Sequence, residues 1–306
     1  MSSVKVIAEI GCNHKGNMDI ARELIRVAAN TCGADVAKFQ KRHNRELLSD
    51  TEFNRAHPVL ENSYGSTYGE HREFLEFDLD QHKDLKNECE KNRIEYSTSV
   101  WDLTSAKEIT SLDPSLIKIP SATNQHYELQ EYLCENFGGE IHVSFGMTTH
   151  DEMDQVIKFY EERERVKDLV IYACTSGYPV KFQDICLLDI HRLQEKYGQK
   201  VKFIGFSGHH LGIAADVAAM TVGIVGEQLY GGQFGYIERH FTLDRTWKGT
   251  DHSASLEPDG LRRLCRDLKN VRSSVAHKPM EILDVEAVQR EKLKWRPRPA
   301  EVISTR

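Results

Sequence analysis

Residues 204–210 read Ile204-Gly205-Phe206-Ser207-Gly208-His209-His210, and residues 237–242 read Ile237-Glu238-Arg239-His240-Phe241-Thr242. Each stretch is a short apolar run that stops at Ser, Glu or His side chains. Apolar runs of this length are typical of buried strands. Polar groups at the C-terminal ends of strands line the active-site rim of parallel α/β proteins. The two stretches therefore predict two neighbouring strands that carry a functional site at their ends.

The rest of the chain repeats the same alternation of strand and helix. Strands are predicted at 4–10, 35–39, 94–98, 116–119, 141–144, 169–173, 201–206 and 236–241. Helices are predicted between the strands, and the first has Ala21, Leu24, Ile25 and Ala28 on one face. The other helices are predicted at 80–91, from residue 102 onward, and at 127–136, 149–165, 184–197, 213–223 and 257–271. Eight such units predict a (β/α)₈ TIM barrel over residues 1–276. A doubly wound open sheet is the alternative, because alternation alone does not show closure.

Two segments fall outside this alternation. Residues 41–69 lack periodicity but contain aromatic and Gly residues, which favours an ordered lid or rim over a flexible linker. Residues 277–306 are basic and contain Pro, and they predict a C-terminal extension with a short helix at 285–293 followed by coil.

Composition excludes several classes of protein. The 306 residues are 40% hydrophobic and carry a net charge of −7, so no overall basic surface points to nucleic acid. The seven cysteines show no CxxC spacing, which is typical of reduced thiols in the cytosol. The N-terminus lacks a signal-peptide layout, and no apolar run reaches bilayer-spanning length. We therefore expect a cytoplasmic protein that binds neither nucleic acid nor membrane.

Polar residues recur at the predicted strand ends. They are Glu9, Lys38, Gln40, Thr98, Lys118, Ser121, Ser144, Ser176, Ser207, His209, Glu238 and His240. Each alone could cap a helix, but together they predict one binding surface. Lys38 and Lys118 have apolar strand neighbours, which favours the barrel lumen for both. Two lumen lysines beside hydroxyl groups would cradle a phosphate or carboxylate, with structural ion pairs as the alternative.

His209 and His240 end the last two predicted strands. Imidazoles on adjacent strands can converge on one divalent cation, although histidines buried in a core and satisfied by hydrogen bonds are equally compatible with this pattern. Glu238 lies two residues before His240, so a strand places both side chains on the same face.

The chain resembles the sialic acid synthase family, whose members condense phosphoenolpyruvate to make nonulosonic acids. The matching motifs are Ile7-Ala8-Glu9-Ile10-Gly11-Cys12-Asn13-His14, Val36-Ala37-Lys38-Phe39-Gln40, Tyr96-Ser97-Thr98-Ser99, Ile117-Lys118-Ile119-Pro120-Ser121, Ser144-Phe145-Gly146-Met147, Cys174-Thr175-Ser176-Gly177-Tyr178-Pro179, Gly205-Phe206-Ser207-Gly208-His209 and Ile237-Glu238-Arg239-His240-Phe241-Thr242. They follow the family's order over residues 4–275. The resemblance implies a (β/α)₈ barrel that condenses phosphoenolpyruvate with a sugar aldehyde such as N-acetylmannosamine and releases phosphate.

The resemblance also implies roles for individual residues. His209 and His240 would bind a divalent metal, Mn²⁺ first, with Mg²⁺ or Co²⁺ as alternatives. The positions that match the phosphoenolpyruvate site are Lys38, Thr98, Lys118, Ser121, Ser144 and Ser207. Glu9, Tyr178 and Asp251 match positions facing the sugar, and Glu238 matches the catalytic carboxylate. Water addition would be helped by Glu238 or Glu9, while Arg239 is expected to point away from the lumen and to be structural.

Three departures from the family pattern are expected to affect the choice of sugar. Common members carry Asn where this chain has Ser176 and Asp where it has Gly208. They also carry a C-terminal antifreeze-like domain that lends an arginine to the partner subunit, and we expect this domain to be missing here. The segment 64–72 could supply replacement contacts to the sugar, or it could be a structured loop over the barrel mouth.

Two other functions compete with this interpretation. One is a sibling phosphoenolpyruvate aldolase that acts on a sugar phosphate, and the other is a non-catalytic barrel that binds an anion. The resemblance also suggests a homodimer.

Overall fold

The apolar runs form parallel strands that close into a barrel. The structure is a computed structural model that describes residues 4–296. Its strands are β1 (Lys5–Gly11), β2 (Val36–Lys41), β3 (Glu95–Val100), β4 (Leu116–Ile119), β5 (Glu140–Ser144), β6 (Leu169–Cys174), β7 (Phe203–Gly208) and β8 (Phe234–His240). Each strand pairs with the next, and β8 pairs with β1, where Glu9 lies opposite His240. This closure confirms the TIM barrel and excludes the open sheet.

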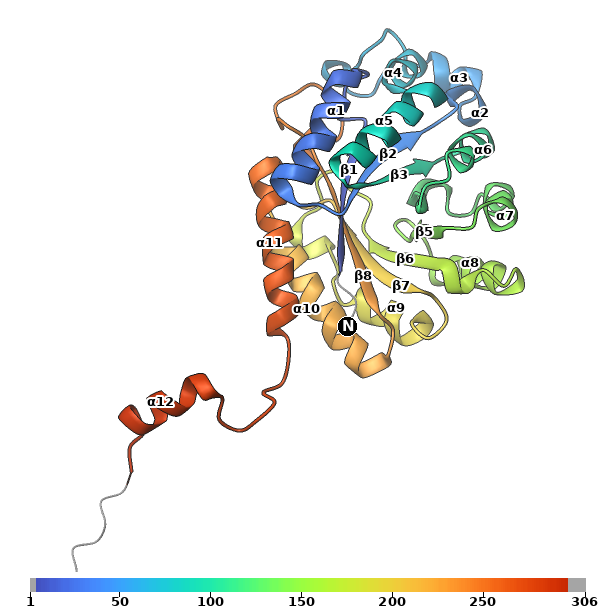
Figure 1. The fold of residues 1–306 in the computed structure, drawn as a ribbon. Coiled ribbons are helices and arrows are strands. Elements are labelled where there is room, and N and C mark those ends of the chain that lie inside the picture. Colours follow the sequence, from blue (N-terminus) through green and yellow to red (C-terminus); the bar gives the residue numbers. More distant parts are fainter. Residues whose placement is uncertain (1–3, 297–306) are drawn as a thin grey trace, which may run out of the picture.

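Helices surround the barrel, as Figure 1 shows. Those that follow strands are α1 (Met18–Arg26), α5 (Leu79–Asn92), α6 (Leu103–Ser111), α7 (Tyr127–Asn136), α8 (His150–Glu162), α9 (Asp189–Tyr197), α10 (Ala214–Tyr230) and α11 (Pro258–Ser274). Each turns an apolar face to the strands, as Ala21, Leu24 and Ile25 of α1 do. Polar side chains begin many of them, and Asp78 accepts a hydrogen bond from the backbone N–H of Gln81 at the start of α5.

Successive strand residues face opposite sides, and this alternation creates two cores. The outward side chains pack under the helices in the larger core. The inward side chains include an apolar cluster of Ile7, Val36, Leu116, Val170, Tyr172 and Tyr236 near the N-terminal ends of the strands. Further along each strand the inward residues are polar. The lumen is therefore packed at its base, and its chemistry lies at the C-terminal mouth.

Two predicted helices differ at one end. The helix predicted at 184–197 begins at Asp189, after a short turn at Phe182–Asp184. The helix predicted at 213–223 continues to Tyr230. Gly223 does not end it, because the missing side chain lets α10 lie directly against the ring of Phe234 on β8.

The segment without periodicity is ordered. It contains α2 (Asn44–Leu47), α3 (Asp50–Asn54) and a turn at Leu60–Asn62, and it leads into α4 (Tyr68–Leu75). Phe53 packs on Gly69, where any side chain would collide with the ring. The rings of His57 and His71 lie 4.4 Å apart. The predicted ordered rim is confirmed, and we call residues 42–75 the lid segment.

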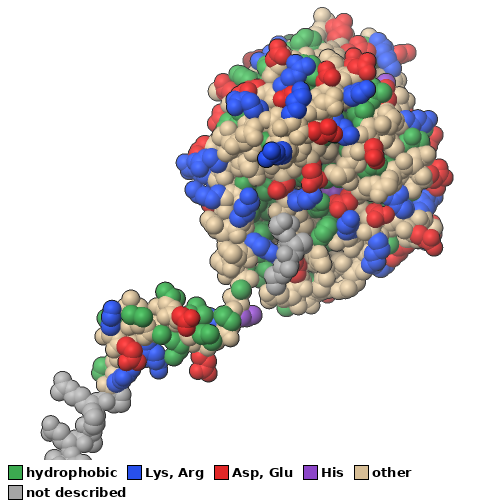
Figure 2. Space-filling model, in the orientation of Figure 1, with side chains coloured by type: hydrophobic (Ala, Val, Ile, Leu, Met, Phe, Trp, Pro, Cys, Tyr) green, Lys and Arg blue, Asp and Glu red, His purple; other side chains and the backbone are tan. Residues whose placement is uncertain are grey.

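The chain leaves the barrel after α11. The boundary predicted at residue 276 falls between α11 and α12 (Asp284–Leu293), which stands apart from the strands in Figure 1. This helix matches the one predicted at 285–293, and Figure 2 shows hydrophobic side chains along it. Val285 and Leu293 are both 77% exposed. The predicted coil lies partly outside the described residues. Within residues 4–296 no helix combines the length and the apolar character needed to cross a membrane.

Candidate active site

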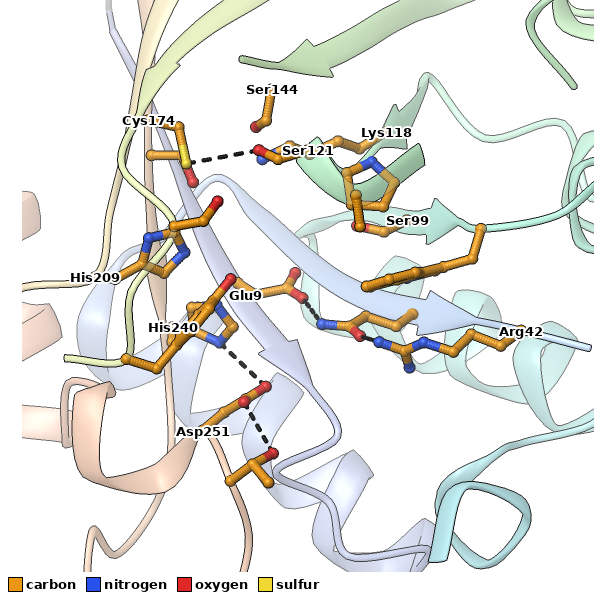
Figure 3. Close-up of a pocket in the computed structure, with 18 of the residues that line it drawn as sticks. Glu9, Arg42, Ser99, Lys118, Ser121, Ser144, Cys174, His209, His240 and Asp251 are labelled. Carbon is orange, nitrogen blue, oxygen red and sulfur yellow. Dashed lines mark hydrogen bonds and ion pairs between the residues drawn. The ribbon is translucent and has the colours of Figure 1, made fainter. Parts of the chain in front are cut away.

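The polar strand ends gather in a cavity of about 460 Å³ at the barrel mouth (Figure 3). All but one of the predicted site residues line it: Glu9, Lys38, Gln40, Lys118, Ser121, Ser144, Ser176, Tyr178, Ser207, His209, Glu238, His240 and Asp251. They come from every side of the barrel. The polar strand ends therefore form one surface in the structure, as predicted.

Thr98 is the exception. It is buried, does not line the cavity, and donates its hydroxyl to Tyr96 Oη at 2.7 Å on the outer face of β3. Ser99, one residue later, lines the cavity and accepts a hydrogen bond from Lys38 Nζ at 2.7 Å. The predicted position is wrong by one residue, and a shift of one residue turns a strand side chain to the opposite face.

Two lysines and two glutamates form the floor of the cavity. Lys118 Nζ lies 2.6 Å from Glu238 Oε1, while Lys38 contacts Glu9 and lies 3.7 Å from Glu238 Oε2. All four side chains are almost fully buried. Both lysines lie in the lumen and face the cavity, as predicted, and both pair with carboxylates that face it too. The role of the lysines as a cradle for an anion stays a prediction.

These pairs control the charge of the floor. Burial raises the pKa of Glu238, but Lys118 and then Lys38 outweigh it, and the pKa is held below its usual value. Burial and the neighbouring Lys38 lower the pKa of Lys118, against the opposing effect of Glu238. Glu238 is thus a carboxylate whose basicity depends on the two ammonium groups beside it.

Hydroxyl groups surround the lysines. Ser207 donates to Glu238 at 3.1 Å, and Ser121 Oγ accepts from the backbone N–H of Gly146 at 3.0 Å. Ser144 Oγ is buried without a hydrogen-bond partner among the described residues. A Cβ at Gly146 would collide with the hydroxyl of Ser176 and lie 2.8 Å from that of Ser121. The glycine therefore lets the backbone approach the hydroxyls of two neighbouring loops.

His209 and His240 lie side by side, with ring centroids 5.3 Å apart. His209 Nδ1 is 3.0 Å from the carbonyl oxygen of Thr175, which fixes the proton on Nδ1 and leaves the Nε2 lone pair for a ligand. Burial, and then the nearby His240, lower the pKa of His209 to about 3, so this imidazole is neutral at physiological pH. His240 Nδ1 is buried without a hydrogen-bond partner among residues 4–296.

Tyr178 and Asp251 complete this side of the cavity. The Tyr178 ring lies 4.4 Å from that of His209. Asp251 Oδ2 lies 3.7 Å from His240 Nδ1. Figure 3 marks this contact with a dashed line. Burial raises the pKa of Asp251, but His240 and then Arg72 outweigh it and lower the pKa. Asp251 follows β8 by several residues and has no strand pattern around it, so only the resemblance pointed to it.

Several lining residues were missed by the sequence reasoning. They are Arg42, His57, Ser99, Trp101, Met147 and Cys174. Arg42 directly follows β2 and Trp101 directly follows β3, so the strand-end rule could have found both. Their side chains stack, with the Arg42 guanidinium 4.0 Å from the Trp101 ring centroid. Tyr68 and Arg72 also line the cavity, and they belong to the segment 64–72 that was expected either to contact the sugar or to form a loop over the barrel mouth.

Three residues near the histidines face away from the cavity. Gly208 was expected near the substrate, but a Cβ there would point outward, 2.8 Å from the Phe206 ring and 3.0 Å from that of His210. The space for an aspartate at this position is therefore filled. His210 is buried rather than at the rim, and it contacts Arg239 and Asp216. Arg239 points outward, as predicted.

The NeuB family profile matches residues 24–279. The chain belongs to the NeuB family. It is 35% identical over 294 residues to the N-acetylneuraminate-9-phosphate synthase of Homo sapiens, covering 94% of this chain and 76% of the relative. It is 28% identical to the N,N'-diacetyllegionaminic acid synthase of Campylobacter jejuni, covering 90% and 78%. The fold matches an N-acetylneuraminic acid synthetase from Leptospira borgpetersenii, solved in complex with citrate, with a TM-score of 0.77, 24% identity, and coverage of 96% and 94%.

Membership of the NeuB family confirms the resemblance drawn from the motifs. The protein is an enzyme, a phosphoenolpyruvate-dependent transferase that forms a carbon–carbon bond to a sugar. The sugar, the metal and the residue roles are not fixed by this membership.

Proposed function

We propose that the protein condenses phosphoenolpyruvate with an open-chain N-acetylmannosamine-type aldehyde, and that its preferred sugar carries a phosphate. The supporting observation is that the lysine floor, with its hydroxyl groups, and the His209–His240 pair line one cavity. The lysine floor suits an anion, and the histidine pair suits the aldehyde as the electrophile. The relative from Homo sapiens and that from Drosophila melanogaster, 32% identical, are both N-acetylneuraminate-9-phosphate synthases, which favours a phosphorylated sugar.

The reaction balances with water as the third reactant. The methylene carbon of phosphoenolpyruvate bonds to the aldehyde carbon, and the aldehyde oxygen takes up a proton. Water adds to the carbon that bears the phosphate, loses a proton, and the intermediate expels inorganic phosphate. The product is a 2-keto-3-deoxy sugar acid, longer than the sugar by three carbons.

The floor would hold phosphoenolpyruvate. Lys38 and Lys118 donate to its carboxylate and phosphate, and Ser99, Ser121, Ser144 and Ser207 supply hydroxyl donors. Ser144 Oγ is a buried polar atom without a protein partner, as expected of a group that meets a ligand. These contacts fix the enol carbon for attack and contribute mainly through orientation.

The two histidines fit a divalent metal, and we propose Mn²⁺, with Mg²⁺ or Co²⁺ as alternatives. The fit rests on two observations. The Nδ1–H of His209 is directed to the carbonyl of Thr175, and the buried Nδ1 of His240 has no hydrogen-bond partner among the described residues. No group of three or more His, Cys, Asp or Glu within residues 4–296 is arranged to hold a metal. The protein would thus supply two ligands, with substrate and water completing the shell. When bound, the ion would polarise the sugar carbonyl.

Glu238 is the proposed base for the water, with Glu9 as the second candidate. In the structure Glu238 is weakly basic because both lysines stabilise its charge. Phosphoenolpyruvate competes for the same ammonium groups. Its binding would therefore raise the basicity of Glu238 at the moment a proton has to be accepted.

The test is phosphate release from phosphoenolpyruvate with Mn²⁺ and a panel of sugars. The panel contains N-acetylmannosamine, its 6-phosphate, arabinose 5-phosphate and erythrose 4-phosphate. We expect release with the N-acetylmannosamine pair, its loss with a chelator, and its loss in His209→Ala. Release only with the last two sugars would instead support the sibling aldolase. If none of the four sugars supports phosphate release, the proposed N-acetylmannosamine-type substrate would be wrong.

Lys118→Ala tests the floor separately. We expect the affinity for phosphoenolpyruvate, measured by calorimetry, to fall at least tenfold, since about 1.5–3 kcal/mol is lost with a charged hydrogen bond. Lys196→Ala is the matched control, because this exposed lysine pairs with Asp154 outside the cavity. Unchanged binding in Lys118→Ala would overturn the assignment of the floor.

A cytoplasmic location, suggested by the unpaired cysteines, and a homodimer stay predictions.

A further inference from the structure

Arg72 differs in its pairing from the other lysines and arginines that line the cavity. Lys38 contacts Glu9, Lys118 pairs with Glu238, and Arg42 Nη1 lies 3.3 Å from Glu76. Among residues 4–296, no carboxylate lies within ion-pair distance of Arg72, although its side chain lines the cavity and is partly buried. A guanidinium in such a position has charge and donors available for a ligand.

The side chain is held in place by a neutral partner. Arg72 Nε and Nη2 donate to Tyr68 Oη at 3.1 and 3.0 Å, which leaves the other donors of the guanidinium unused by the described residues. Tyr64, on the same segment, donates its hydroxyl to the carbonyl of Lys248 in the loop after β8. This contact ties the lid segment across the mouth, and Arg72 is near enough to Asp251 to lower its pKa.

Depth separates this position from the floor. Lys38 and Lys118 are almost fully buried on strands, whereas Arg72 lies on α4 in the lid segment. His209 directly follows β7, and His240 is the last residue of β8. A sugar whose aldehyde carbon meets the histidines and the bound phosphoenolpyruvate therefore extends its far end outward. The far end of an open-chain hexose is its sixth carbon.

We propose that Arg72, oriented by Tyr68, binds the phosphate on the sixth carbon of the sugar and thereby sets the preference for a phosphorylated substrate. The inference rests on the proposed condensation, in which three carbons come from phosphoenolpyruvate. Carbon six of the sugar then becomes carbon nine of the product, the position named in the relatives' 9-phosphate. A guanidinium fork suits a phosphate through paired charge-assisted hydrogen bonds.

The test compares Arg72→Gln and Arg72→Lys with the wild-type protein on N-acetylmannosamine and on its 6-phosphate. We expect Arg72→Gln to lower kcat/KM for the phosphorylated sugar at least tenfold and to change kcat/KM for the other sugar less than threefold. Arg72→Lys should recover part of the preference, because it keeps the charge and loses the fork. Arg55→Gln is the matched control: it lies in the same segment, stacks on the same Tyr68 ring at 4.8 Å, and does not line the cavity.

The ratio of the kcat/KM values for the two sugars separates an effect on phosphate recognition from an effect on folding. A disturbed lid would lower activity on both sugars together, and an equal loss in Arg72→Gln would overturn the proposal. An unchanged preference would overturn it as well.

A binding measurement keeps the inference separate from the proposed function. The probe is the 6-phosphate of the reduced sugar, N-acetylmannosaminitol, which has no aldehyde and cannot react. If wild-type protein turns over neither sugar, the proposed function is wrong, and calorimetry with this probe still decides the role of Arg72. At least tenfold weaker binding to Arg72→Gln would support the phosphate site, and equal binding would overturn it.

Discussion

Ser99 and Thr98 are adjacent in β3, and only Ser99 meets the cavity. Its hydroxyl accepts a hydrogen bond from Lys38 Nζ at 2.7 Å, so Ser99→Ala removes a contact that orients a floor lysine. We expect Ser99→Ala to raise KM for phosphoenolpyruvate several-fold in the phosphate-release assay. Thr98→Val should leave KM unchanged and cost about 1 kcal/mol of stability, through loss of the bond to Tyr96. The opposite pattern would show that the strand faces are assigned in reverse.

Gly146 shows how a residue without a side chain shapes the site. Its N–H donates to Ser121 Oγ at 3.0 Å, and a Cβ would collide with the hydroxyl of Ser176. Gly146→Ala should therefore weaken phosphoenolpyruvate binding at least tenfold by displacing both hydroxyls. The melting temperature should change little, because the side chains that must move line a cavity rather than a packed core. A large loss of stability with normal binding by the folded fraction would contradict this account.

At the scale of elements, a buried cluster joins α10 to the ends of β7 and β8. Arg239 on β8 contacts Asp216 of α10, donates to the carbonyl of Gly212 at 2.9 Å, and lies 3.1 Å from His210 Nε2. Arg239 and Asp216 are fully buried. Because Arg239 lies between Glu238 and His240, and His210 follows His209, this cluster lies directly behind the cavity and supports the strand ends that carry its histidines.

Removing one partner of this cluster should be costly. Asp216→Ala leaves the Arg239 charge buried without its carboxylate, and we expect a loss of about 3–5 kcal/mol in the free energy of unfolding. Urea denaturation measures it. Asp259→Asn is the control, because Asp259 forms exposed pairs with Arg262 and Arg263 and should change stability by no more than about 1 kcal/mol. Equal effects of the two substitutions would contradict the structural role of the buried cluster.

The elements themselves were predictable, whereas the faces of one strand and the ends of some helices were not. Apolar runs bounded by Gly and polar residues mark buried strands, so all eight strands were found. In Ser97-Thr98-Ser99 the residues are too alike for the pattern to reveal which face is inward. Gly223 looked like a helix end, because its packing against Phe234 is a tertiary contact that local sequence does not encode. The segment 64–72 was expected as a possible source of sugar contacts, but without periodicity its sequence did not indicate which side chains, here Tyr68 and Arg72, would reach the cavity.

At the scale of the whole molecule, the two ends of the barrel have different tasks. The mouth carries the cavity, and the base carries the apolar cluster closed by a polar group around Glu140. Glu140 accepts from Tyr236 Oη at 2.7 Å, and its carboxylate lies 3.1 Å from His142 Nε2 and 3.0 Å from Lys202 Nζ. This carboxylate therefore links β5, β8 and the residue preceding β7 at the end of the barrel away from the chemistry.

Such a division predicts a stability that depends on pH without a matching change at the active site. Burial raises the pKa of Glu140, but His142, Tyr236 and Lys202 outweigh it and lower the pKa from 4.5 to about 2. A depressed pKa in the folded state means that the stabilisation is complete above about pH 4.5 and is lost as the pH falls toward 2. The shift corresponds to roughly 3 kcal/mol.

Glu140→Gln should therefore melt at a lower temperature than wild type at pH 7, and the difference should shrink steadily as the pH is lowered below 4.5. At pH 7 and temperatures well below melting, kcat/KM should be that of wild type, because Glu140 does not line the cavity. A melting difference that stays constant from pH 7 to pH 3 would show that the charge of Glu140 is not what holds the base of the barrel together.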